Sequence, residues 1–215
     1  MGRKISDIYS EYKTMSGIWE HMFRVAAVAS LICDNFDEPL PKEEIITACL
    51  LHDMGNIIKS DLKYFPEFVQ PEGIDYWQDV KDEFIEKYGS DEHEANLKIT
   101  REIGLSENII SFLDKNRFSF LCEHAEGNDI TIKIVHYADG RVNPHGVVSY
   151  LDRMEEARMR YQDKNKGHEA EREKLVACGA EMEKQIFSKC KIKPEDITDE
   201  TIAPIIEELK NFVIK

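Results

Sequence analysis

The chain has 215 residues, of which 42% are hydrophobic and 33% are charged, and its formal net charge is −14. This length fits one large domain, or one domain with an extension, and the hydrophobic fraction is sufficient for a buried core. The acidic balance argues against a nucleic acid or an anionic membrane as partner, because both require basic surfaces. A small phosphorylated substrate is still compatible with it, since such a substrate needs only a locally positive or metal-loaded pocket.

The cysteines are dispersed and odd in number, with no close CxxC pair: Cys33, Cys49, Cys122, Cys178 and Cys190. This pattern is typical of a reduced intracellular chain rather than of a disulfide framework. The first residues contain no long apolar core of the signal-peptide kind, and no apolar run approaches the length of a membrane span. We therefore expect a cytoplasmic protein with free thiols.

Helical periodicity begins within residues 19–36, where His21, Val25, Val28 and Ile32 recur at spacings of four, three and four. These spacings place the four side chains on one face of a helix. The next predicted helix lies within residues 41–56, which open with a proline and acidic residues and contain Gly55 near the end. Proline is favoured at a helix start, and glycine is favoured just beyond a helix end.

Three further segments complete the first part of the chain. Helices are expected over residues 71–89, bounded by Pro71 and Gly89, and over residues 90–106, with a Ser/Asp cap signal at the start and a stop at Gly104. Short helices or turns follow to residue 124. Residues 129–142 contain β-branched residues, but a lone strand would have no partner sheet in this chain, so a buried helix is predicted there.

Beyond residue 146 the composition changes. Residues 147–190 are predicted to form long charged helices, with Gly167 as the one expected break. The last segment has an apolar stripe at helical spacing, made of Ile202, Ile205, Ile206, Leu209, Phe212 and Val213. We predict an all-α fold with a core over residues 1–146 and a helical C-terminal extension, residues 147–215, packed on it. The alternative is that the extension is a dimerisation arm and the protein is a homodimer.

His52 and Asp53 follow an apolar run and precede Gly55. A buried carboxylate must be paired, protonated or bound to a metal. Neighbouring residues on a helix point about 100° apart, so the two side chains can converge only at a helix end, which Gly55 supplies. Other ligands would come from His21, on the inward face of the earlier helix, and from Asp139, which ends another apolar run. Mixed nitrogen and oxygen ligands suit Mn, Fe, Co, Ni or Zn, and Mg is a further candidate.

The order His21, His52-Asp53 and Asp139 on a helical background resembles the HD-domain superfamily of metal-dependent phosphohydrolases. The matching segments are "EHMFRVA", "ACLLHDMGNII" and "YADGRV", which together cover roughly residues 19–142. The resemblance implies an HD helical bundle in which these four side chains hold a divalent metal ion. It also implies hydrolysis of a phosphomonoester or phosphoanhydride bond, most simply in a nucleotide, by a metal-activated water, with Asp53 as a catalytic residue. The family commonly continues HDxGK, whereas Asn56 stands here in place of that lysine.

Some members of the family carry two further histidines that hold a second metal. His93 and His124 lie in the corresponding interval. The alternative for His93, which Glu92 and Glu94 flank, is a solvated surface residue. We predict one well-occupied metal, with His93 near it and important for turnover, and a second position that is empty or weakly filled. Glu92 or Glu94 is the candidate general acid.

The positions of some basic and aromatic residues in the sequence make them candidates for binding the substrate. Arg24 lies one turn after His21, where it would either grip a phosphate as a bidentate fork or form a surface ion pair. Lys59 and Arg141 are further phosphate candidates. Aromatic residues after the His-Asp pair would either wall a pocket for a base or belong to the core: Tyr64, Phe65, Phe68, Tyr76 and Trp77.

Two other functional classes fit the same residues. One is an oxygenase with a di-iron centre, for which three histidines would also be suitable. The other is a sensor module that binds metal or nucleotide without turnover. Phosphate loops of the GxGxxG and GxxxxGK[ST] kinds are absent, as are HExxH and GxSxG motifs, so the nucleotide-binding and hydrolase classes that those motifs mark are not indicated.

Overall fold

The computed structural model describes residues 2–160 and 167–215, and it confirms the predicted all-α fold. The α-helices of the described part are α1 (Ile5–Glu11), α2 (Ser16–Asn35), α3 (Lys42–Leu51), α4 (Ile74–Tyr88), α5 (Glu92–Ile103), α6 (Glu107–Lys115), α7 (Leu121–Glu126), α8 (Ile130–Asp139), α9 (Tyr150–Arg160), α10 (Glu169–Phe187) and α11 (Asp199–Leu209). Short 3-10 helices are η1 (Asn56–Lys59), η2 (Pro66–Val69), η3 (Phe118–Phe120) and η4 (Pro194–Asp196).

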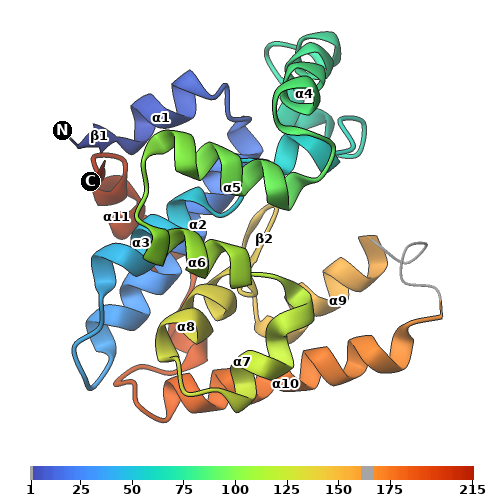
Figure 1. The fold of residues 1–215 in the computed structure, drawn as a ribbon. Coiled ribbons are helices and arrows are strands. Elements are labelled where there is room, and N and C mark those ends of the chain that lie inside the picture. The colour runs from blue at the N-terminus through green and yellow to red at the C-terminus, as the bar shows by residue number, and fades with distance from the viewer. Residues whose placement is uncertain (1, 161–166) are drawn as a thin grey trace.

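The central helix of the molecule is α2. Nearly all its side chains between Met22 and Ile32 are buried, and α3, α8 and α11 pack against it (Figure 1). The last seven residues of α3, Ile45 to Leu51, are buried as well. A helix that is apolar on all sides lies inside a protein rather than on its surface. These two helices therefore form the middle of the core, and the first turns of α2 and the end of α3 reach its border.

The helix ends follow the local signals in the sequence. The Asp91 carboxylate accepts a hydrogen bond from the Glu94 backbone N–H at 2.8 Å, and so caps α5. The same helix ends at Gly104, whose φ of +91° is a left-handed conformation that favours glycine. The segment with β-branched residues is helix α8, capped by Asp129, which confirms the prediction of a buried helix over a strand.

The C-terminal residues lie on the core in the described structure. Helix α11 packs against α2, and α10 packs against α7 and α8. Strand β1 (Arg3–Lys4) pairs antiparallel with β4 (Val213–Ile214), so the two ends of the chain lie side by side (Figure 1). A second two-residue pair joins β2 (Val142–Asn143) to β3 (Gly146–Val147). The helical prediction for residues 161–166 lies outside the described residues.

The prediction that the cysteines are all free thiols is wrong. Cys122 of α7 and Cys178 of α10 form a disulfide, whereas Cys33, Cys49 and Cys190 are free. The pairing depends on tertiary packing, because α7 lies on α10 with Leu121 and Met182 buried between them. Two cysteines that are 56 positions apart in sequence are thereby brought within bonding reach.

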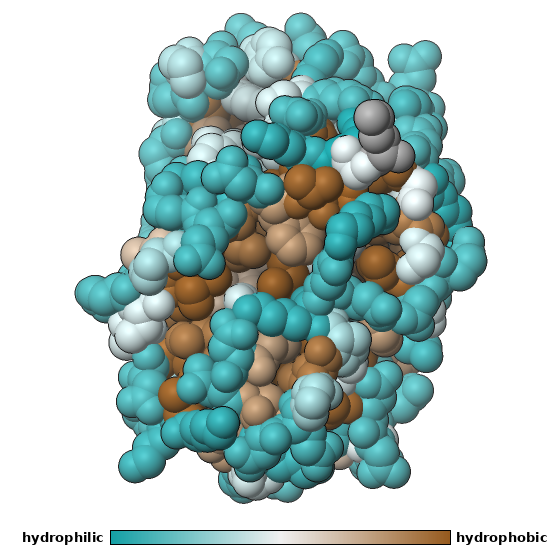
Figure 2. Space-filling model, turned by 90° about the vertical axis from the view of Figure 1, so that its left-hand side faces the viewer, coloured by the Kyte–Doolittle hydropathy of each residue, from teal (hydrophilic) through white to brown (hydrophobic). Residues whose placement is uncertain are grey.

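The surface is mostly hydrophilic, as the charged composition requires. Figure 2 shows the face that lies on the left of Figure 1, where hydrophilic residues dominate and hydrophobic residues show between them near the centre. Within residues 2–160 and 167–215, no helix combines the length and the apolar character needed to cross a bilayer.

Candidate metal centre

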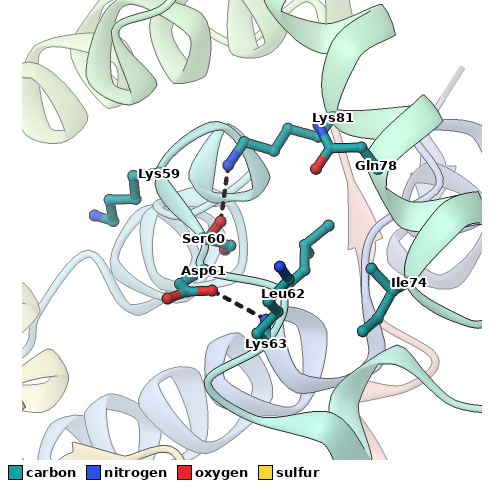
Figure 3. Close-up of a pocket in the computed structure, with 8 residues that line it drawn as sticks. All are labelled: Lys59, Ser60, Asp61, Leu62, Lys63, Ile74, Gln78 and Lys81. Carbon is teal, nitrogen blue, oxygen red and sulfur yellow. Dashed lines mark hydrogen bonds between the residues drawn. The ribbon is translucent and has the colours of Figure 1, made fainter.

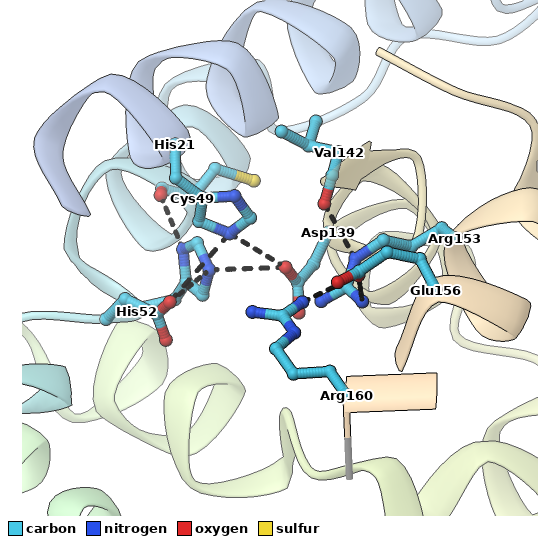
Figure 4. Close-up of polar contacts among 9 residues, drawn as sticks. His21, Cys49, His52, Asp139, Val142, Arg153, Glu156 and Arg160 are labelled. Carbon is cyan, nitrogen blue, oxygen red and sulfur yellow. Dashed lines mark hydrogen bonds and ion pairs between the residues drawn. The ribbon is translucent and has the colours of Figure 1, made fainter. Parts of the chain in front are cut away.

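Three helices bring four ligand-type side chains to one place. His21 comes from the second turn of α2, His52 is the residue at which α3 ends, and Asp53 follows it in a turn. Asp139 is the last residue of α8. The site therefore depends on helix ends, where consecutive residues leave the helical path and can point toward a common centre (Figure 4).

The four side chains are close enough to share one ion. Ligand atoms of His21, His52 and Asp53 all lie within 4.8 Å of one another. Asp139 Oδ1 lies 3.0 Å from His21 Nε2 and 3.5 Å from His52 Nε2. Asp53 Oδ2 lies 3.8 Å and 3.6 Å from the same two nitrogens. Two imidazoles and two carboxylates around one point form a donor set suited to a divalent transition metal.

The orientation of His52 leaves one nitrogen directed at this centre. His52 Nδ1 lies 2.8 Å from the backbone oxygen of Cys49, to which it donates a hydrogen bond. Such a bond fixes the ring and its tautomer, as is usual for metal-binding histidines. His52 Nε2 is buried and has no hydrogen-bond partner. A buried polar nitrogen without a partner is costly, so the arrangement fits a site that receives a ligand at this atom.

The electrostatics of the cluster favour a positive charge at its centre. Burial alone would lower the pKa of His52, but the carboxylates of Asp53 and Asp139 outweigh it and raise the pKa to about 9. Burial would raise the pKa of Asp139, yet contacts with His21 and His52 hold it well below the usual range. The raised pKa of His52 and the lowered pKa of Asp139 both mean that the two carboxylates stabilise a positive charge between them.

The cluster opens into a cavity of about 450 Å³. His21, Asp53 and Asp139 form one part of its wall. The remaining lining is partly apolar and aromatic, from Met15, Gly17, Ile18, Leu62, Tyr64, Phe65, Phe68, Val69, Val142 and Pro144, and partly polar, from Asn56, Lys59, Ser60, Asp61, Asn143, Arg153 and Arg160. A cavity of this size, with an apolar and aromatic part and converging polar groups, is typical of a small-molecule site.

A second cavity, of about 320 Å³, shares residues 59–62 as lining and is completed by Lys63, Ile74, Gln78 and Lys81 (Figure 3). Three lysines line it: Lys59, Lys63 and Lys81. Lys81 Nζ donates a hydrogen bond to the Ser60 backbone oxygen at 2.8 Å, which ties α4 to this segment. Lys59 lines both cavities, so it is the one predicted phosphate-binding residue that the structure places beside the candidate centre.

The structure brings neither of the two further histidines to the cluster. His93 Nε2 lies 3.1 Å from Asp114 Oδ1, an exposed carboxylate. His124 is buried and donates from Nε2 to the Lys115 backbone oxygen at 3.0 Å, with its ring 5.2 Å from that of His136. Within the described residues, the group of side chains spaced for a metal contains neither of them. His93 is therefore not one of the side chains spaced to share an ion, and its ring contacts Asp114 of α6 instead.

The other acidic and basic candidates also lie outside the cavity wall. Arg24 donates to Glu20 at 3.4 Å, one turn earlier on α2, which is the ion-pair alternative rather than the phosphate fork. Glu92 lies 3.5 Å from Lys59 Nζ, so it borders the site through that lysine. Neither Glu92 nor Glu94 lines the cavity.

Arg141 is not a phosphate-binding residue, and this prediction is corrected. Its side chain is buried and its donors are engaged by other groups: Nε by the Val148 oxygen at 2.5 Å, Nη1 by Tyr137 Oη at 2.7 Å and the Pro194 oxygen at 3.1 Å, and Nη2 by the Ile197 oxygen at 3.1 Å. The charge ties the end of α8 to the C-terminal residues instead. Its proximity in sequence to Asp139 gave a wrong indication, because the Arg141 side chain contacts Pro194 and Ile197 although the next residues, Val142 and Asn143, line the cavity.

Two arginines that sequence reasoning missed do line the cavity. Arg153 and Arg160 both come from α9, in the C-terminal extension. They are seven positions apart, and this spacing places them on one face of a helix. The sequence carries that spacing, but nothing in it indicates that this face of α9 turns toward a cavity that His21 and Asp53 also line.

Comparison with known proteins agrees with the geometry. The family model of the HD domain matches residues 18–141, which is more than half of the chain and contains all four clustered side chains. Comparisons with curated proteins and with solved structures gave no match. The matched segment begins in the first turn of α2, just before His21, and ends just after Asp139. The chain therefore belongs to the HD domain family, a superfamily of metal-dependent hydrolases.

Proposed function

We propose that this protein is a metal-dependent phosphohydrolase that cleaves a phosphomonoester or phosphoanhydride bond of a nucleotide. The observation that carries the proposal is the cluster of His21, His52 and Asp53, whose ligand atoms lie within 4.8 Å of one another beside a cavity. Asp139 adds a second carboxylate to it. Four ligands from segments far apart in sequence make a site that exists only in the folded chain.

The residues present fit one divalent ion. His52 Nε2 is buried and makes no hydrogen bond, and the carboxylates of Asp139 and Asp53, 3.5 and 3.6 Å away, supply the balancing negative charge. When bound, such an ion supplies Lewis-acid chemistry, which activates water and neutralises phosphate oxygens. The chain itself contributes orientation: the Cys49 carbonyl fixes the His52 ring, and His21 holds the Asp139 carboxylate by a 3.0 Å hydrogen bond.

The aromatic wall of the cavity supports a nucleotide as substrate. Phe65 lies with its ring 5.1 Å from that of Phe68 and 5.6 Å from that of His145. Aromatic faces of this kind offer a stacking surface for a base. Tyr64, which is largely exposed, extends the same wall, whereas Trp77 is buried in the core and does not contribute.

The proposal is tested first by metal analysis of the purified protein, followed by phosphate release from a panel of nucleotides with Mn, Co, Mg or Ni added. We expect His52→Ala and Asp53→Ala to lose metal and turnover together while the helical content persists. His168→Ala is the matched control, because His168 is exposed and forms a surface ion pair with Glu171. Full metal occupancy and turnover in either site variant would contradict the assignment.

The same experiment separates the other functional classes. Iron in the purified protein together with oxygen consumption would indicate an oxygenase. Tight nucleotide binding without phosphate release from any member of the panel would indicate a sensor module. Phosphate release that depends on His52 and Asp53 supports the hydrolase.

A further inference from the structure

The candidate centre faces a group of charged side chains from outside the matched family segment. Helix α9 carries Arg153, Glu156 and Arg160 at spacings of three and four, so all three lie on one face of the helix. Arg153 Nη1 donates to Glu156 Oε2 at 2.9 Å, and Arg160 Nη2 donates to the same oxygen at 2.6 Å. Figure 4 shows the three side chains close to Asp139, on the side opposite the two histidines.

Both guanidinium groups are held in place. Arg153 Nε donates to the Val142 backbone oxygen at 2.8 Å, and the side chain is 18% exposed. The Arg160 guanidinium lies 5.9 Å from the centre of the Phe65 ring, and its side chain is 15% exposed. Half-buried arginines with fixed orientation lose little side-chain entropy when an anion binds, which makes them effective anion ligands.

The local charge is opposite to that of the whole chain. Two guanidinium groups share one carboxylate, so this group carries an excess positive charge in a protein with a net charge of −14. Arg153 and Arg160 line the same cavity as His21, Asp53 and Asp139. A phosphate in this cavity would thus lie between arginine donors on one side and the candidate metal centre on the other.

We propose that Arg153 and Arg160 bind the phosphate group of the substrate, so that the C-terminal extension supplies the anion-binding half of the site. This inference rests on the proposed function, because it assigns the phosphate-binding groups of that same site. Arg24 and Arg141 are the arginines nearest the metal-ligand candidates in sequence, but neither of them lines the cavity. The guanidinium of an arginine is a planar fork whose fixed N–H donors can bind two oxygens of a phosphate. A lysine such as Lys59 offers the phosphate only a point charge.

The test uses the full-length protein with inorganic phosphate as the probe, and isothermal titration calorimetry as the readout. We expect Arg153→Gln and Arg160→Gln each to weaken phosphate binding about tenfold or more, since each removes a charge-assisted contact. Arg158→Gln is the matched control. Arg158 lies on the same helix, pairs with Glu155 at the surface, and is absent from the cavity lining.

Metal content and melting temperature are measured in the same samples. Arg160→Lys keeps the charge but loses the fork, so we expect intermediate phosphate affinity with unchanged metal content. Arginine-dependent phosphate binding in a protein that hydrolyses no nucleotide would support this inference while contradicting the proposed function. Phosphate affinity equal to wild type in both glutamine variants, or no phosphate binding by the wild-type protein at millimolar concentration, would overturn it.

Discussion

Gly55 is required for a steric reason rather than a conformational one. Its φ is −90°, which any residue adopts, but an added Cβ would lie 2.3 Å from the Glu92 backbone oxygen and 2.9 Å from the Asn96 backbone nitrogen. The turn that carries Asp53 therefore packs directly on the first turn of α5. A larger residue would separate the two.

We expect Gly55→Ala to lower the free energy of unfolding by about 1–3 kcal/mol, as overpacking does, and to weaken divalent-metal binding as Asp53 moves. Denaturant unfolding and metal titration measure the two effects. Gly127→Ala is the comparison, because the nearest backbone oxygen, that of Glu123, would lie 3.2 Å from its Cβ and the loss should be smaller. Wild-type stability and metal affinity in Gly55→Ala would refute the steric argument.

His136 makes the fold sensitive to acid. Burial, and then the neighbouring charge on His124, lower its pKa to about 4, while Asp139 opposes this shift. The unfolded chain binds the proton near pH 6.5, so the unfolded state gains stability relative to the folded state as the pH falls from 6.5 toward 4. The whole shift corresponds to a loss on the order of 3 kcal/mol.

We therefore expect wild-type stability to fall between pH 6.5 and pH 4.5, and His136→Gln to flatten this part of the profile. Denaturant unfolding at several pH values gives the slope, which is independent of any constant loss caused by the substitution. Equal slopes for wild type and variant would show that His136 is not the group responsible.

Local signals in the sequence were sufficient to predict some residues of the candidate site but not the others. His52 and Asp53 could be recognised because a helix end and a glycine are encoded within a few residues. The arginines of the cavity wall could not be recognised, since Arg153 and Arg160 meet the centre only through the packing of α9 on the core. The prediction that Arg141 binds phosphate was wrong for the same reason. Its neighbours in space are Pro194 and Ile197, which are distant from it in sequence.

Helices themselves were more predictable than their contacts. Caps such as Asp91 and Asp129 and the left-handed Gly104 mark helix ends through bonds within four residues. By contrast, the packing of α7 on α10 joins segments about fifty residues apart, and with it the disulfide of Cys122 and Cys178. Periodicity indicates which face of a helix is buried but not which helix covers it.

The disulfide should stabilise the contact between α7 and α10. Closing a loop of 56 residues in the unfolded chain corresponds to about 4 kcal/mol in the chain-entropy model. We expect the oxidised protein to melt at a lower temperature after addition of reductant, and Cys122→Ser to melt at that lower temperature with or without it. Cys190→Ser is the control, because Cys190 is a free thiol. A melting temperature unaffected by reductant, in protein shown by mass spectrometry to contain the bond, would contradict this.

The N-terminal and C-terminal ends of the chain contact each other and the core. Strand β1 pairs with β4, α11 packs on α2, and the buried Arg141 joins the end of the family segment to the backbone oxygens of Pro194 and Ile197. Because α9 also contributes to the cavity wall, the extension and the matched segment share both a core and a candidate site. We propose on these grounds that residues 1–146 and 147–215 unfold as one cooperative unit.

Arg141→Met tests this cooperativity directly. The substitution removes the hydrogen bonds that Arg141 donates to Tyr137 Oη and to the backbone oxygens of Val148 and Ile197, so we expect a loss of about 3 kcal/mol or more in the free energy of unfolding. Both tryptophans, Trp19 and Trp77, precede residue 147, so fluorescence reports on the matched segment while circular dichroism reports on all helices. In wild type and variant alike the two signals should change at the same denaturant concentration, with the variant's midpoint lower and that of Arg158→Met unchanged. A loss of helix signal before any change in fluorescence would show that the C-terminal helices unfold first, and that Arg141 stabilises only their attachment.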